Sequence, residues 1–284
     1  MKCQQETIEL QGHSLRRYIF CPSEKESIRG AAIHFHGQGD FSERYGEILQ
    51  PFLQNGIACV ATDLPGHGRS DGSRGCVPGL EIVDHIAEAG QQLCEELCNH
   101  RDLPLGILGH SAGGLLALRE LLRNPAPYSF SWISSPLLKP AANQNPFLVC
   151  LAPVAAHLLP GFTVATGVTR EQCASPSDPG RGEDQSEPFH DRVSLGWGHA
   201  LIKAARSVEK QFRERPPQLP ILITQGLRDP VCAPHHLHAL LEESPPPHLT
   251  LRNFPEALHE PFSDRCREEV FSEIAAWLGH GLIA

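Results

Sequence analysis

The sequence predicts an α/β fold, a mostly parallel central sheet flanked by helices, with one inserted segment. Three observations indicate this. Apolar segments of strand length alternate with segments of helical periodicity over most of the chain. The stretch from Leu105 to Leu116 passes from an apolar run through a Gly-x-Ser-x-Gly turn into a helix-forming sequence. Between about Leu137 and Gly198 the alternation stops, which is the mark of an insertion.

Composition limits the class of protein. A chain of 284 residues with 40% hydrophobic content suits one α/β domain with an insertion. The formal net charge is −9, and no run of lysine or arginine is present, which argues against a nucleic-acid partner. No apolar stretch approaches the roughly 18 to 20 residues that span a bilayer, so no transmembrane segment is expected.

Cysteine usage indicates a reducing compartment. The ten cysteines are scattered without a C-x-x-C pair, and residues 1–10 lack the apolar core of a signal peptide, so we expect a cytoplasmic protein. Cys94 and Cys98 share a helix face but have no histidine at ligand spacing, and we interpret them as packing residues.

The expected elements follow from periodicity and from turn signals. Strands are predicted over residues 8–10, 15–20, 30–35, 57–62, 105–108, 128–133, 221–224 and 249–251. Helices are predicted over residues 42–55, 80–97, 115–122, 147–159, 199–212 and 262–278.

The turn around Ser111 is the predicted catalytic centre. Gly109 and Gly113 flank it where side chains would collide with neighbouring backbone, and the strand-turn-helix context is that of a nucleophile elbow. A serine hydroxyl is nearly inert at neutral pH, so a base and an orienting acid are required elsewhere in the chain.

Two later loops supply candidates for these roles. Asp229 lies just beyond the predicted buried strand 221–224, and His259 lies on the loop after the last predicted strand. The chain order Ser111, Asp229, His259 is the order of the triad in folds built around a Gly-x-Ser-x-Gly elbow. Three other carboxylates lack a preceding buried strand: Asp178, Asp184 and Asp264.

The glycine-rich turn after strand 30–35 predicts an oxyanion loop. The backbone amide of Gln38 is the expected donor there, together with the amide of Ala112, and His36 is expected to brace the loop. His34, His36 and Asp40 superficially resemble a two-metal pattern, but the spacing and the final histidine do not match. We therefore expect no metal and no organic cofactor.

Three motifs in order carry a family resemblance: His36-Gly37-Gln38-Gly39 with Tyr45 downstream, Asp63 to Gly72 (DLPGHGRSDG), and Gly109 to Gly114 (GHSAGG). Together they resemble the monoacylglycerol lipase and lysophospholipase group of the α/β-hydrolase superfamily. Ala112 departs from the methionine that is usual in this group, which leaves the backbone donor intact but alters the pocket wall. The resemblance implies a serine hydrolase that cleaves carboxylic esters and needs no cofactor.

The insertion is interpreted as a cap, or lid, over residues 137–198, with the core formed by residues 1–136 and 199–284. Its apolar part is expected to bind an acyl chain above Ser111 and to contact a membrane surface transiently, through Phe147, Leu148, Leu151, Leu158 and Leu159. A monoacylglycerol or lysophospholipid is the predicted substrate. A small-ester esterase, a peptidase of the same fold, or a non-catalytic ligand-binding protein remain alternatives.

Overall fold

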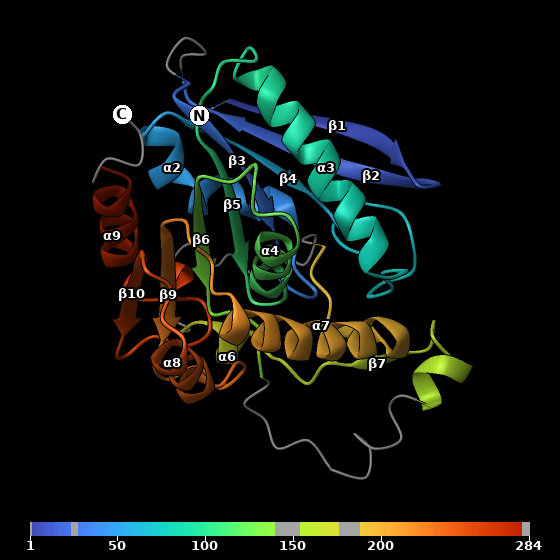
Figure 1. Cartoon of the computed structure of the whole chain (residues 1–284). Helices are drawn as coiled ribbons and strands as arrows, with labels where there is room; N and C mark the ends of the chain where they lie inside the picture. Colours follow the sequence, from blue (N-terminus) through green and yellow to red (C-terminus); the bar gives the residue numbers. More distant parts are fainter. Residues whose placement is uncertain (1, 24–27, 140–153, 176–187, 280–284) are drawn as a thin grey trace.

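The computed structural model describes residues 2–23, 28–139, 154–175 and 188–279 (Figure 1). These residues form an eight-stranded sheet with the strand order β1-β2-β4-β3-β5-β6-β9-β10. Its strands are β1 (Lys2–Leu10), β2 (His13–Cys21), β3 (Gly30–Phe35), β4 (Ile57–Thr62), β5 (Leu105–His110), β6 (Phe130–Ser134), β9 (Ile221–Gly226) and β10 (Leu249–Phe254).

The strands from β4 to β10 in this order pair in parallel, whereas β1 and β2 form an antiparallel hairpin whose second strand pairs antiparallel with β4. Every residue of β3, β4 and β9 is buried, because helices cover both faces of a sheet of this kind. The carboxyl ends of the parallel strands meet at one edge, which is where open α/β sheets place their sites.

Helices divide the core between the two faces of the sheet. One face carries α3 (Leu80–Leu97), α4 (Ala112–Arg123), α7 (Leu195–Glu214) and α8 (Pro234–Glu243). The other carries α1 (Tyr45–Ile48), α2 (Gln50–Gln54) and α9 (Arg267–Gly279). Figure 1 shows α9 beside β10 at one flank, and α7 running across the end of the sheet where the cap also lies.

Several boundaries differ from the expected ones. The predicted helix 42–55 is divided into a 3-10 turn (η2, Ser42–Arg44), α1 and α2, with Pro51 at the start of α2, where its missing N–H is tolerated. The predicted helix 262–278 begins only at Arg267, after a 3-10 turn (η3, Pro261–Ser263). Helix α8 was not predicted.

The described part of the cap is small. It contains a helical segment at residues 154–158, a two-stranded sheet of β7 (Thr163–Ala165) and β8 (Arg192–Ser194), and the short helix α6 (Arg170–Cys173). Helix α7 begins at Leu195, four residues before its predicted start at residue 199, and its Trp197 is packed in the main core. The predicted acyl-binding residues Phe147, Leu148 and Leu151 lie outside the described residues.

Candidate active site

Ser111 lies on a strained turn between β5 and α4. It has φ 55° and ψ −120°, a conformation that is costly for a residue with a side chain. At Gly113 a Cβ would clash with the carbonyl oxygen of Phe35, and at Gly109 with that of Gly113. The Gly-x-Ser-x-Gly sequence is therefore required by local packing, and the predicted elbow is present.

Asp229 and His259 form a buried hydrogen-bonded pair. The Nδ1–H of His259 donates to Oδ2 of Asp229 at 2.8 Å, and the two residues are 3% and 5% exposed. The other carboxylate oxygen accepts the backbone N–H groups of Val231 and Cys232 at 2.8 and 2.9 Å. These donors hold the carboxylate still, and its bond to Nδ1 leaves Nε2 of His259 as the proton acceptor.

The loops that carry the two residues approach each other closely. A Cβ at Gly226, the last residue of β9, would clash with the carbonyl oxygen of Leu258. The N–H of Arg228 also donates to the carbonyl of Ala257 at 3.0 Å. Backbone contact between the two loops therefore sets the distance from Asp229 to His259.

The side chain of Ser111 points into the same cluster. Ser111 and His259 line one cavity, and the thiol of Cys232 lies beside the Ser111 hydroxyl. Burial, followed by the charge of Asp229, raises the pKa of the Cys232 thiol well above its usual value, so this neighbour is an uncharged thiol. Within the described residues the Ser111 hydroxyl makes no hydrogen bond to His259.

His110 packs against the histidine of this pair. Its ring centroid lies 4.7 Å from that of His259 and 4.8 Å from that of Phe262. Burial, reinforced by His259, holds the pKa of His110 well below its usual value, so His110 is neutral.

The loop after β3 is braced as predicted. Nδ1–H of His36 donates to the carbonyl of Gly37 at 2.8 Å, and Nε2 accepts the N–H of Leu64 at 3.0 Å. Gly37 has its Cα against Ser111, since a Cβ built there would lie 3.5 Å from the Cβ of Ser111. The backbone amides of Gln38 and Ala112 make no hydrogen bond within the described part of the chain, so both predicted donors are available.

An ion-pair network below this loop was not predicted. The partly buried guanidinium of Arg44 contacts Asp40 at 3.0 Å, Glu260, and the hydroxyl of Ser263 at 3.0 Å. Burial acts to lower the pKa of Arg44, but Glu260 and Asp40 outweigh it and hold the pKa well above its usual value. Because Glu260 follows His259 directly, this network ties the histidine loop to the segment after the oxyanion loop.

A cavity of about 1250 Å³ opens above Ser111. Its walls come from the oxyanion loop, from residues 166–173 and 188–193 of the cap, and from α7. The predicted acyl-binding residues Leu158 and Leu159 are not in these walls; they are 70% and 58% exposed, because the segment that carries them faces outward. The described cap residues that line the cavity instead include Val168, Phe189 and Val193.

Asp229, Cys232 and His259 also have the spacing of metal ligands. Their ligand atoms lie within 4.8 Å of one another, and all three residues are buried. The carboxylate of Asp229 is already fully engaged by His259, Gln225 and two backbone amides. Protein donors therefore already satisfy both oxygens of this carboxylate.

The fold and the elbow together define the class of protein: an α/β-hydrolase with a serine at the nucleophile position. The chain matches the family described as "Serine aminopeptidase, S33" over residues 26–266, and it belongs to that family.

Lipases are among the similar proteins. A monoacylglycerol lipase of Mycolicibacterium smegmatis is 28% identical over 88% of both chains, and a monoglyceride lipase of Rattus norvegicus is 27% identical over 93% of this chain and 88% of the relative. The crystal structure of Paleococcus ferrophilus monoacylglycerol lipase superposes with a TM-score of 0.79 at 27% identity, covering 93% of this chain and 98% of that one. The resemblance to monoacylglycerol lipases is confirmed.

Proposed function

We propose that this serine hydrolase cleaves carboxylic esters of the monoacylglycerol type through Ser111, His259 and Asp229. Ser111 attacks the ester carbonyl, His259 takes its proton and returns it to the leaving alcohol, and Asp229 holds the imidazole tautomer. The amides of Gln38 and Ala112 stabilise the oxyanion. The 2.8 Å bond between Asp229 and His259, in a cavity shared with the strained Ser111, is the observation that carries this proposal.

The proton transfer requires a small movement of Ser111. Among the described residues no hydrogen bond joins the Ser111 hydroxyl to His259, so rotation about χ1 brings the hydroxyl to Nε2 of His259. Such catalytic hydrogen bonds often tighten only when substrate is bound.

The acyl chain occupies the cavity between cap and core. An ester with one long apolar chain suits a cavity of this size, and a lysophospholipid is the second substrate class to test, since a phospholipase of Bacillus subtilis is 24% identical over 86% of this chain. The cytoplasmic location stays a prediction from the sequence. In the described residues no helix is both long and apolar enough to cross a membrane.

The cap also presents an outward apolar surface. Val154, Leu158, Leu159 and Phe162 are each more than half exposed, and they lie within nine residues of chain. We propose that these four residues, the cap patch, contact the lipid surface from which substrate is taken.

Covalent labelling tests the nucleophile. A fluorophosphonate probe should label the wild-type chain and not Ser111→Ala, and ester hydrolysis by that variant should fall roughly 10⁴-fold or more. The Cys232→Ser variant is the control, because it changes the neighbour of Ser111 and should keep the label. Labelling that persists in Ser111→Ala would refute the assignment, and absence of labelling in wild type would favour a non-catalytic binding protein.

An acyl-length series tests the substrate class. Each buried methylene contributes about 0.8 kcal/mol, so kcat/KM should rise roughly fourfold for each added carbon until the cavity is full. A flat profile would favour the small-ester esterase. Faster cleavage of an aminoacyl amide than of the matched ester would favour a peptidase.

A further inference from the structure

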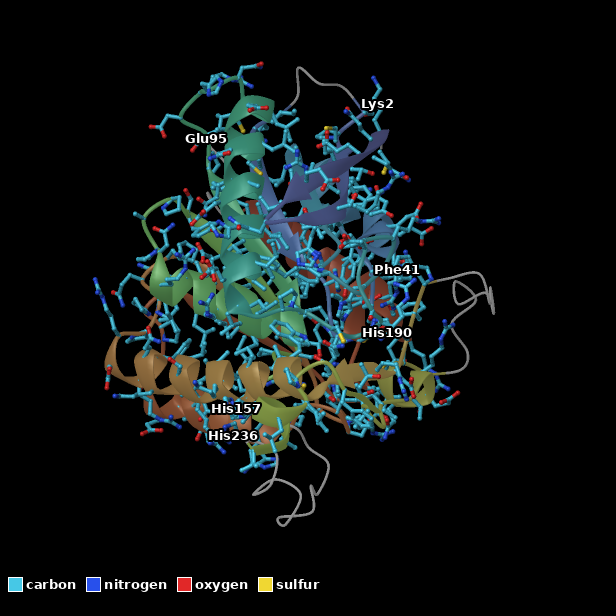
Figure 2. The ribbon with its side chains drawn as sticks, turned by 90° about the vertical axis from the view of Figure 1, so that its right-hand side faces the viewer. Lys2, Phe41, Glu95, His157, His190 and His236 are labelled. Carbon is cyan, nitrogen blue, oxygen red and sulfur yellow. The ribbon has the colours of Figure 1, made fainter. Side chains whose placement is uncertain are left out.

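The cap returns to the core as a segment that lies between two core loops. This segment, residues 188–197, is bonded on both sides: His190 N–H donates to the carbonyl of Gly39 at 3.0 Å, and Ser194 N–H donates to that of Gly75 at 2.9 Å. A Cβ at either glycine would clash with the backbone of the segment. Figure 2 shows His190 close to Phe41, whose ring is also 4.9 Å from that of Phe189. The cap backbone therefore packs directly on the oxyanion loop.

The side chain of Gln38 is held by this segment at both of its ends. Its Nε2 donates to the carbonyl of Arg192 at 2.8 Å, and its Oε1 accepts the indole N–H of Trp197 at 2.8 Å. A planar amide with both ends bonded has one allowed orientation. The cap thus fixes the side chain of the residue whose backbone amide is the proposed oxyanion donor.

Trp197 is a rigid anchor for this bond. It is 1% exposed in the first turn of α7, and the hydroxyl of Ser194 caps that turn by accepting the N–H of Trp197 at 3.2 Å. Gln38, by contrast, lies between Gly37 and Gly39, and Gly39 has φ 76°. Glycines on both sides restrict this peptide little by themselves, so the bonds around it set its orientation. These are the backbone bonds from Asp40 N–H to the carbonyl of Gly37 at 3.2 Å and from His190 N–H to that of Gly39, together with the two side-chain bonds of Gln38.

We propose that Trp197 and the side chain of Gln38 are positioning residues that aim the Gln38 amide at the oxyanion, so that the cap completes the oxyanion hole. His36 braces the start of the loop, and Trp197 braces its tip from the first turn of α7, where the cap segment joins the core. Oxyanion stabilisation depends on a donor pointing to where the charge develops, and small misplacements are costly. This inference rests on the proposed ester hydrolysis.

The test uses Trp197→Phe, which keeps an aromatic ring but removes the indole N–H, and Gln38→Leu, which keeps the backbone amide. On soluble p-nitrophenyl butyrate, kcat should fall about tenfold to a hundredfold with KM changed by less than about twofold, because the interaction acts in the transition state. The double variant should be no worse than Gln38→Leu alone, because that variant already removes the bond to Trp197 together with the bond to Arg192. The Ki of a trifluoromethyl ketone analogue should rise by the factor by which kcat/KM falls.

Trp132→Phe is the matched control. The indole of Trp132 also donates a buried hydrogen bond, to the hydroxyl of Thr224 at 3.1 Å, but it lies within β6 and away from the oxyanion loop. Its loss should lower the melting temperature and leave kcat unchanged.

The outcomes separate this inference from the proposed function. Four results would each overturn this inference while leaving ester hydrolysis intact. They are a wild-type kcat in Trp197→Phe, a change in KM alone, an equal fall of kcat in Trp132→Phe, and additive falls of kcat in the double variant. If wild type itself fails to hydrolyse the ester, both proposals fail. If Trp197→Phe does not fold, Gln38→Leu alone decides, because Gln38 lies in a loop, is only partly buried and belongs to neither core cluster.

Discussion

At the residue scale, the orientation of His259 depends on one carboxylate. Asp229→Asn keeps the shape of the side chain but replaces an acceptor with a donor that cannot hold the Nδ1–H tautomer. We expect kcat to fall about 10⁴-fold with little change in melting temperature, as in other triads of this kind. Steady-state kinetics on a soluble ester, with thermal unfolding alongside, measures both.

Asp264→Asn provides the matched control for that change. Asp264 lies on the same loop as His259, and its carboxylate accepts the N–H of Leu258 at 3.0 Å and of Arg265 at 2.8 Å. Burial acts to raise the pKa of Asp264, but these amides hold it below its usual value, so the carboxylate is a structural brace. If kcat falls further in Asp264→Asn than in Asp229→Asn, Asp229 is not the acid of the triad.

Residues in local patterns were predictable, and residues defined by distant contacts were not. Ser111 has its signal in five adjacent letters, and Asp229 and His259 each follow an apolar strand. Arg44 and Glu260 are 216 residues apart, so no spacing could pair them. Cys232 was missed for the same reason, because its contact with Ser111 exists only after β5 and β9 are assembled in one sheet.

At the element scale, the helical segment 154–158 and the turn after it should bind lipid surfaces. Replacing Leu158 and Leu159 with aspartate removes two exposed apolar side chains from the cap patch. A buried leucine contributes about 1.5–3 kcal/mol, so partitioning into phosphatidylcholine vesicles should fall at least about tenfold. Hydrolysis of a soluble short ester should stay unchanged, since neither residue lines the cavity.

Ser207→Asp is the control for added charge. Ser207 is exposed on α7, away from the cap patch, and the variant should bind vesicles as wild type does. Co-sedimentation with vesicles measures the partitioning. Equal binding by the cap variant and by wild type would exclude the cap patch as the lipid contact.

Elements with one clear period were predicted well, and elements set by packing were not. Helix α3 was predicted at its exact bounds, because its apolar side chains keep a helical period over 18 residues. The start of α7 was misplaced because Trp197 and Ser194 are fixed by the oxyanion loop and by the helix cap, which periodicity does not register. Helix α8 was missed although Leu237, Leu240 and Leu241 have helical spacing, because it is only 10 residues long and its first turn is rich in histidine.

At the scale of the whole molecule, the core contains histidines that stay neutral. Burial lowers the pKa of His34, His67 and His110 well below 6.5, and burial followed by the charge of Arg74 lowers the pKa of His190 to about 4. These side chains remain unprotonated in the folded chain at pH values where the unfolded chain binds protons. The sequence shows that the chain has 16 histidines, but it does not show which of them are buried.

Acid should therefore unfold the protein through these histidines. A histidine whose folded pKa lies below 6.5 leaves stability unchanged above about pH 7.5, and the stability falls as pH drops through 6.5 toward the folded pKa, because the unfolded state then binds more protons. Each such group contributes up to about 1.4 kcal/mol per pH unit. The urea midpoint should change little between about pH 8 and pH 7.5 and then fall steeply between about pH 6.5 and pH 4.5. In His190→Gln the slope of the unfolding free energy against pH should be smaller by up to the equivalent of one proton. Above pH 7.5 the curves of the variant and of wild type should be parallel. A wild-type midpoint that stays flat down to pH 5 would show that these histidines are protonated without unfolding, and that the buried positions admit charge.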